Sequence, residues 1–162
     1  MTGINITQLK ALVIRPVLAM LPPQWASAAA VNLLAGTVLV ESSGIYLTQL
    51  GGGPALGICQ MEPITHNDCF ATFLNYPDQA ILKSAVLALL APQPPSPLDQ
   101  LPGNLFYAVA MARIKYIRAP DPLPNANDAD GLADYHKTFY NSSLGATQVD
   151  ASSLLFAQAI AA

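Results

Sequence analysis

A run of fifteen apolar or small residues, 26–40, does most to limit what this chain can fold into. The run contains Asn32 and Gly36 but no charge, so a helix built from it would be apolar nearly all round. Such a helix is stable in water only when other elements cover most of its faces. We therefore expect a helix from Pro23 to Val40 at the centre of the domain, with Glu41 at its C-terminal end.

The remaining segments also favour helices. Apolar residues recur at helical spacing in six further stretches: 4–20, 67–74, 78–90, 104–117, 128–140 and 151–161. No segment shows the sustained alternation of a half-buried strand. We predict one all-α domain spanning 1–162, with an N-terminal helix or arm over 1–22 and proline-rich loops at 91–103 and 119–127.

Local signals fix several expected helix boundaries. Asn104 is a strong N-cap candidate, and Asp128 or Asp130 begins the next helix. Thr147 with Asp150 has the spacing of a capping box and predicts a short final helix. Pro16 lies inside the first helical pattern, so we expect a break or kink there.

Composition excludes some classes of function. Charged residues make up 10% of the chain, against roughly 25% in ordinary domains, which suggests either an assembly or a surface rich in small polar residues. A net charge of −3 disfavours sequence-independent nucleic-acid binding, which needs a basic face. The apolar run 26–40 is shorter than the roughly 20 residues of a membrane-spanning helix, so we expect a soluble protein without a cleaved leader. Cys59 and Cys69 could form one bridge, but buried reduced thiols are the preferred interpretation.

Glu41 is the strongest candidate for chemistry. It follows an apolar helix, and burial raises a carboxyl pKa, as does a helix C-terminus, so the group could hold a proton near neutral pH. A protonated carboxyl can donate to a glycosidic oxygen as the bond breaks. The glycine-rich turn 51–53 can approach a sugar ring closely, and Gln60 can hydrogen-bond a hydroxyl or acetamido group.

These residues carry a resemblance to a known family. Glu41-Ser42, followed by Gly57-Ile58-Cys59-Gln60-Met61 with Pro63 and Thr65, resembles the "E-S … G-L-M-Q-x-x-P-x-T" pattern of soluble lytic transglycosylases. The same segment, with His66, is similar to goose-type lysozymes. Tyr140-Asn141-Ser142-Ser143-Leu144-Gly145 resembles the family's "A-Y-N-A-G-x-G" element, and Asn104-Leu105 resembles its "N-I" helix start.

The resemblance implies a lysozyme-like helical fold and cleavage of the β-1,4 bond between N-acetylmuramic acid and N-acetylglucosamine in peptidoglycan glycan strands, without a cofactor or metal. Glu41 would be the acid and then the base. The substrate-binding residues would be Ser42, Gly57, Gln60, Met61, Tyr140 and Asn141. Cys59 stands where the family has Met or Leu, Phe139 and Ser142-Ser143 replace small residues, and Glu62 adds a second carboxyl.

The residue pattern of the segment 51–68 resembles lysozyme-like proteins of tailed-phage particles more than bacterial cell-wall enzymes. This suggests a virion or tail protein that contacts other virion proteins and acts at the bacterial cell wall. Two alternatives stay open: a structural virion component with little or no activity, and a sugar-binding module without turnover.

Other chemistries have weaker support. Glu62, His66, Asp68 and Cys69 carry metal-ligand atoms, but no second nearby His or paired Cys completes a set. The serines after Glu41 lack the turn of a serine hydrolase, and the glycine run lacks the Lys of a phosphate-binding loop. We expect His66 to hydrogen-bond at a helix start and His136 to be exposed on its helix. We expect Arg113, Lys115 and Arg118 to form a solvated face.

Overall fold

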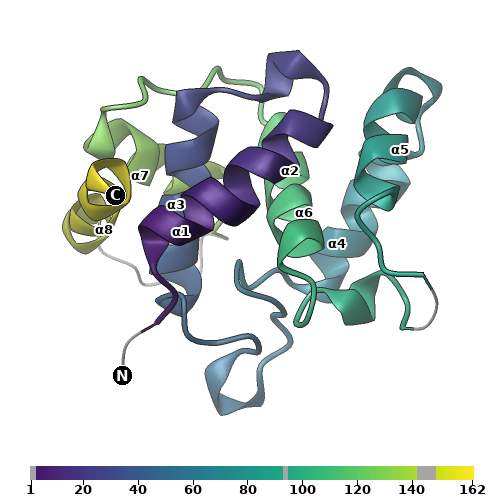
Figure 1. Ribbon diagram of the computed structural model, residues 1–162, viewed down its shortest axis with the longest axis horizontal. Coiled ribbons are helices and arrows are strands. Elements are labelled where there is room, and N and C mark those ends of the chain that lie inside the picture. Colours follow the sequence, from purple (N-terminus) through teal and green to yellow (C-terminus); the bar gives the residue numbers. More distant parts are fainter. Residues whose placement is uncertain (1–2, 93–94, 142–148) are drawn as a thin grey trace.

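The computed structural model describes residues 3–92, 95–141 and 149–162, and these residues form an all-α fold, as predicted (Figure 1). The described residues contain no β-strand, and two isolated bridges join Thr48 to Leu56 and Leu56 to Met61. The α-helices are α1 (Ile6–Leu9), α2 (Arg15–Met20), α3 (Ala28–Ser42), α4 (Pro63–Cys69), α5 (Ala80–Leu87), α6 (Leu105–Ile117), α7 (Ala129–Phe139) and α8 (Val149–Ala161). None of the helices among these residues is long and apolar enough to cross a membrane.

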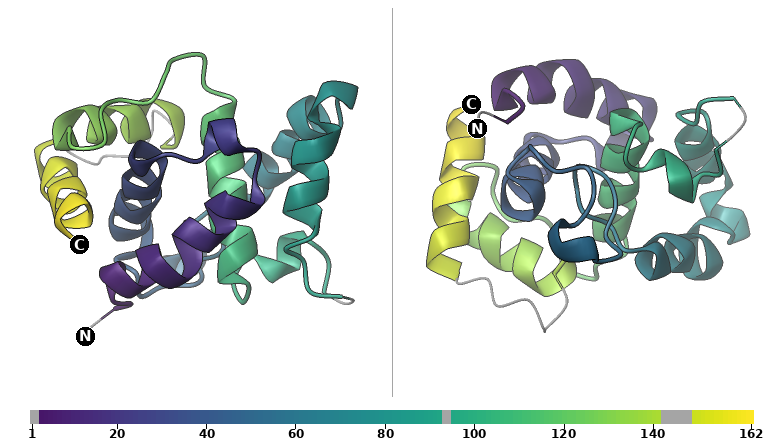
Figure 2. Two further views of the ribbon diagram at one scale, coloured as in Figure 1. Left: turned by 45° about the horizontal axis from the view of Figure 1, so that its top comes forward. Right: turned by 90° about the horizontal axis from the view of Figure 1, so that it is seen from below.

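Helix α3 occupies the centre of the fold, which confirms the expected buried helix. Every residue from Ala30 to Leu39 is buried. The helices α1 and α2, α6, α7 and α8 surround it, as the view from below shows (Figure 2). Gly36 lets α8 approach closely, because a Cβ at this position would lie 2.1 Å from the Phe156 ring.

The predicted start of this helix is wrong. Pro23–Trp25 forms a separate turn of 3₁₀ helix, and the α-helix begins at Ala28, where the Ser27 hydroxyl accepts a hydrogen bond from the Ala30 amide. Proline suits the first turn of a helix, but Ser27 supplies the side-chain cap that the first amides need.

The N-terminal helix runs from Ile6 to Met20 and contains a π-helical stretch, Lys10–Ile14. In this stretch the Arg15 amide donates to the Lys10 carbonyl, five residues back. Pro16 follows at once and has no amide hydrogen, so the wider turn accommodates a residue that an α-helix would not. The break expected at Pro16 is therefore a change of helix type.

The N-caps of α6 and α7 are as predicted. The Asn104 side chain accepts from the Tyr107 amide, and the Asp128 side chain accepts from the Gly131 amide. The capping box expected at Thr147 lies outside the described residues. In the first proline-rich loop, the buried Gln100 side chain accepts from the Ala91 amide and donates to the Ala91 carbonyl, which anchors the loop.

Two expectations about polar residues are wrong. His136 is 1% exposed, because α7 turns it inward against α3 and α6. The basic residues of α6 do not share a solvated face: Arg113 is buried and donates to the Trp25 carbonyl, while Arg118 pairs with Asp68 at 2.5 Å. Lys115, the third of them, faces a pocket.

Candidate functional site

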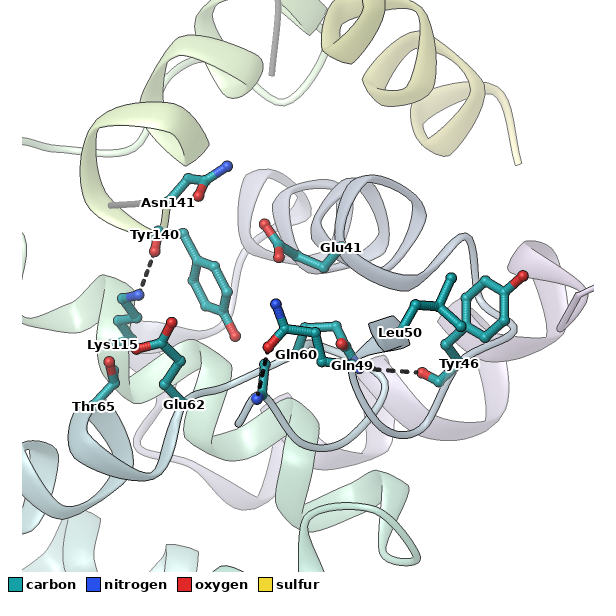
Figure 3. A pocket seen from close by; sticks show the side chains of 11 residues that line it. Glu41, Tyr46, Gln49, Leu50, Gln60, Glu62, Thr65, Lys115, Tyr140 and Asn141 are labelled. Atoms are coloured by element: carbon teal, nitrogen blue, oxygen red, sulfur yellow. Dashed lines mark hydrogen bonds between the residues drawn. The ribbon is translucent and has the colours of Figure 1, made fainter. Parts of the chain in front are cut away.

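A pocket of about 400 Å³ lies at the C-terminal end of α3. Its walls come from α3, the loop between α3 and α4, the start of α4, the last turn of α6 and the residues directly after α7. The lining residues are Glu41, Tyr46, Gln49, Leu50, Ala55, Gln60, Glu62, Thr65, Lys115, Tyr140 and Asn141. Figure 3 shows the Glu41 side chain projecting from the end of α3, with Tyr140, Lys115 and Glu62 across from it. The structure thus brings Glu41 and Gln60 to one cavity.

One oxygen of the Glu41 carboxylate is buried, although the residue lines the pocket. Its side chain is 17% exposed, and its Oε1 atom is buried 3.0 Å from the Nε2 atom of His136. Although the two atoms are close, neither makes a hydrogen bond of regular geometry among the described residues. The contact leaves Oε2 as the oxygen that a ligand in the pocket can reach.

His136 is held from behind by two hydroxyl groups. Its Nδ1 atom lies 2.7 Å from the Tyr116 hydroxyl, which in turn lies 2.7 Å from the Thr37 hydroxyl. Thr37 donates to the Leu33 carbonyl at 2.8 Å. These side chains are buried, so a polar chain runs from the backbone of α3 through α6 and α7 back to Glu41.

Gln60 occupies an unusual backbone conformation opposite Glu41. Its φ is +46°, in the left-handed region that few non-glycine residues adopt. The side-chain amide donates to the Gly57 carbonyl at 2.8 Å and to the Tyr46 carbonyl at 3.4 Å, which holds the turn together. Since the amide hydrogens face the protein, the carbonyl oxygen is the group left for a ligand.

Three predicted substrate-binding residues do not line the pocket. Ser42, Gly57 and Met61 are buried behind it. The Ser42 hydroxyl donates to the Ile58 carbonyl at 2.7 Å and accepts from the Gly44 amide at 3.2 Å, which fastens the loop to α3. In this structure, these residues shape the wall from behind.

Tyr140 and Lys115 form the opposite wall. The Tyr140 hydroxyl donates to the Cys59 carbonyl at 2.8 Å, and the ring lies 4.2 Å from the Lys115 ammonium. Lys115 also donates to the main-chain carbonyl of Tyr140. Burial lowers the pKa of Lys115, and attraction to Glu41 opposes that shift. Asn141 completes the wall, and the rest of the predicted closing element, 142–145, lies outside the described residues.

Sequence reasoning missed several lining residues and the one that contacts the acid. Tyr46, Gln49, Glu62, Thr65 and Lys115 line the pocket without having been predicted as site residues. One signal for His136 was present in the sequence. Leu132, His136 and Tyr140 recur every four residues, which places His136 on the apolar face of its helix.

The described residues offer no cluster of three His, Cys, Asp or Glu side chains that could hold a metal ion. Cys59 and Cys69 are free, buried thiols. Burial raises the pKa of both, so neither has the character of a nucleophile. His66 is buried at a helix, where its Nε2 atom lies 2.7 Å from the Tyr107 hydroxyl, a structural contact away from the pocket lining.

Comparison with family models, with curated proteins and with solved structures finds no match to this chain. The lysozyme-like arrangement therefore stays a prediction.

Proposed function

We propose that this protein cleaves peptidoglycan glycan strands at the β-1,4 bond between N-acetylmuramic acid and N-acetylglucosamine. The observation that carries the proposal is the Glu41 carboxylate on the wall of a cavity that Gln60 also lines. The cavity volume falls within the range of about 300–1,000 Å³ typical of small-ligand sites. Its amide, hydroxyl, carboxylate and aromatic lining suits a sugar. The resemblance of the segment 41–66 to lytic transglycosylases and goose-type lysozymes supplies the substrate class.

Glu41 would act first as an acid and then as a base. It donates its proton to the glycosidic oxygen while the bond from that oxygen to C1 breaks. The resulting carboxylate then takes the proton of the attacking hydroxyl as the new bond to C1 forms. Only one carboxyl group is needed when the attacking group is the muramic 6-hydroxyl, and the product then has a 1,6-anhydro end.

Hydrolysis is the variant that a second carboxylate would support. Glu62 is exposed and lines the same pocket, where it could activate a water molecule. Mass spectrometry of digested sacculi separates the two reactions, since anhydro ends form only in the first.

The biological setting is part of the proposal. A phage particle, with other virion or tail proteins as partners and the bacterial cell wall as the place of action, fits the low content of charged residues. A second candidate function, a structural virion component with little or no activity, is favoured by one observation. The Glu41 Oε1 atom already lies against His136, as it would in a carboxylate kept for structure.

The replacement of Glu41 by Gln tests the enzyme against the structural component. We expect Glu41→Gln to lower cleavage of purified sacculi by about 10²- to 10⁴-fold, the usual contribution of a general acid, with the same circular dichroism spectrum. Turbidity loss and released muropeptides are the measurements.

Two matched variants accompany this experiment. Asp134→Asn removes an exposed carboxylate from α7 and should leave cleavage unchanged. Glu62→Gln should retain cleavage by a transglycosylase and lose it in a two-carboxylate hydrolase. Equal clearing by wild type and Glu41→Gln would reject Glu41 as the acid, and no clearing by either would favour the structural component.

A further inference from the structure

The buried chain behind Glu41 allows two arrangements of its hydrogens. The Thr37 hydroxyl has one hydrogen, and its acceptors are the Leu33 carbonyl at 2.8 Å and the Tyr116 hydroxyl at 2.7 Å. If the hydrogen goes to Leu33, Tyr116 donates to Thr37 and accepts from Nδ1 of His136. If it goes to Tyr116, Tyr116 donates to Nδ1, and the proton of a neutral ring lies on Nε2.

The two arrangements differ in what lies between His136 and Glu41. With the only ring proton on Nδ1, the bare lone pair of Nε2 would face the Glu41 Oε1 atom 3.0 Å away. Two facing lone pairs would repel, and both atoms are buried without another hydrogen-bond partner among the described residues. A proton on Nε2, shared with Oε1, removes the repulsion.

We propose that His136 is the positioning residue of Glu41, and that the pair holds one proton between Nε2 and Oε1 while Oε2 exchanges the proton of the reaction. This inference rests on the proposed glycan cleavage, but the state of the ring can be measured without it. Oε2 is the oxygen that remains toward the pocket once Oε1 is buried.

The other ionisable groups packed around the pair are neutral, apart from one lysine. Tyr116 of α6 and Tyr140 after α7 are buried, and burial raises their pKa well above the usual range, so they stay neutral. Burial also raises the pKa of Cys59 in the loop. Lys115 is a cation that acts on Glu41 from the far wall of the pocket. From α8, the ring of Phe156 packs 5.7 Å from the imidazole.

The arrangement keeps two protons apart. One stays on Nε2 of His136, shared with Oε1 of Glu41. The other passes from Oε2 to the leaving oxygen, and the Glu41 carboxylate then takes the proton of the attacking hydroxyl on Oε2. Removal of the imidazole should therefore leave Glu41 in the pocket but less well oriented for proton transfer.

The test compares kcat and KM for cleavage of sacculi by wild type, His136→Gln and Lys137→Gln. In His136→Gln we expect kcat to fall by about 10- to 100-fold with KM little changed, as when the partners that orient metal ligands are removed. Lys137 is the next residue on α7 and exposed, so Lys137→Gln should match wild type. An unchanged kcat in His136→Gln would overturn the proposal.

Nitrogen-15 NMR of the imidazole gives a readout that needs no activity. We expect Nε2 of His136 to carry a proton in the wild type. Tyr116→Phe removes the hydroxyl that contacts Nδ1 and should leave the Nε2 proton in place. A bare Nε2 in the wild type would overturn the inference even if the protein cleaves glycan. Absence of cleavage would instead reject the proposed function, and the spectrum would still decide the state of the pair.

Discussion

Gly57 is required both by its backbone angle and by its surroundings. Its φ is +75°, where side chains other than hydrogen are strained. A Cβ at this position would lie 2.5 Å from the Leu101 carbonyl oxygen, a backbone atom that cannot swing away. The residue therefore sets how closely the loop that carries Gln60 approaches the start of α6.

We expect Gly57→Ala to lower the free energy of unfolding by about 2–4 kcal/mol, from a left-handed alanine and the forced contact together. Urea unfolding followed by circular dichroism measures the change. Gly103→Ala is the matched control: nothing lies within 4 Å of its added carbon, and it should change stability by less than about 0.5 kcal/mol. Equal stability of the two variants would show that the loop moves freely relative to α6.

Helices α3 and α8 pack closely at Gly36, where there is no room for a side chain. The Phe156 ring lies over Gly36 and also packs 5.7 Å from the His136 ring. Helix α8 therefore covers both the central helix and the residue behind the acid.

We expect Gly36→Ala to destabilise the protein by about 1–3 kcal/mol, because a methyl group would have to displace the Phe156 ring. Phe156→Leu in the same chain makes room, so the double variant should be less destabilised than the sum of the two single variants. A double-mutant cycle of urea unfolding energies checks this, with coupling of about 0.5–3 kcal/mol expected. Strict additivity would mean that the two residues do not share their space.

How well the sequence predicts each helix depends on whether the signal is local. The N-caps at Asn104 and Asp128 were predictable because a cap involves only the next three residues. The burial of α3 was predictable because its apolar run has no polar face. The π-helical stretch 10–14 was not, because one wider turn barely changes the periodicity of apolar residues. The start at Ala28 was missed because the prolines at 22 and 23 outweighed the Ser27 cap.

A buried hydrogen bond joins the first helix of the protein to the last one. Lys10, in the first helix, is 6% exposed, and its ammonium donates to the Ala159 carbonyl in the last helix at 2.7 Å. Burial and repulsion from Arg15 lower the pKa of Lys10. Residues 149 positions apart are thus joined, and the first helix contacts the last one.

We expect Lys10→Met, which keeps the apolar stem, to cost about 1–3 kcal/mol, since it leaves a carbonyl without its donor. Thermal unfolding should remain a single transition at a lower midpoint. Lys137→Met, at an exposed position, should be neutral. A biphasic transition in Lys10→Met would instead mean that α8 separates on its own.

The pocket was only partly predictable because it is assembled at this largest scale. Glu41 and Gln60 are near each other in the chain, so a tight loop could be expected to bring them together. Lys115 and His136 come from α6 and α7, far from Glu41 in the sequence. Nothing in the sequence next to either residue indicates which side chain it will contact. Their places follow from how the outer helices dock on α3.

Thr37 and Glu41 lie four residues apart on α3, about one helical turn. The polar chain that passes through Tyr116 and His136 begins at the first of them and ends at the second, so this one turn sets the distance between its ends. Aspartate at 41, shorter by one methylene, would fall short of the imidazole and of the cavity alike. An insertion between 37 and 41 would rotate the carboxylate about 100° away from both. Any relative of this protein that keeps the chemistry must therefore keep the length of this turn along with the identity of its residues.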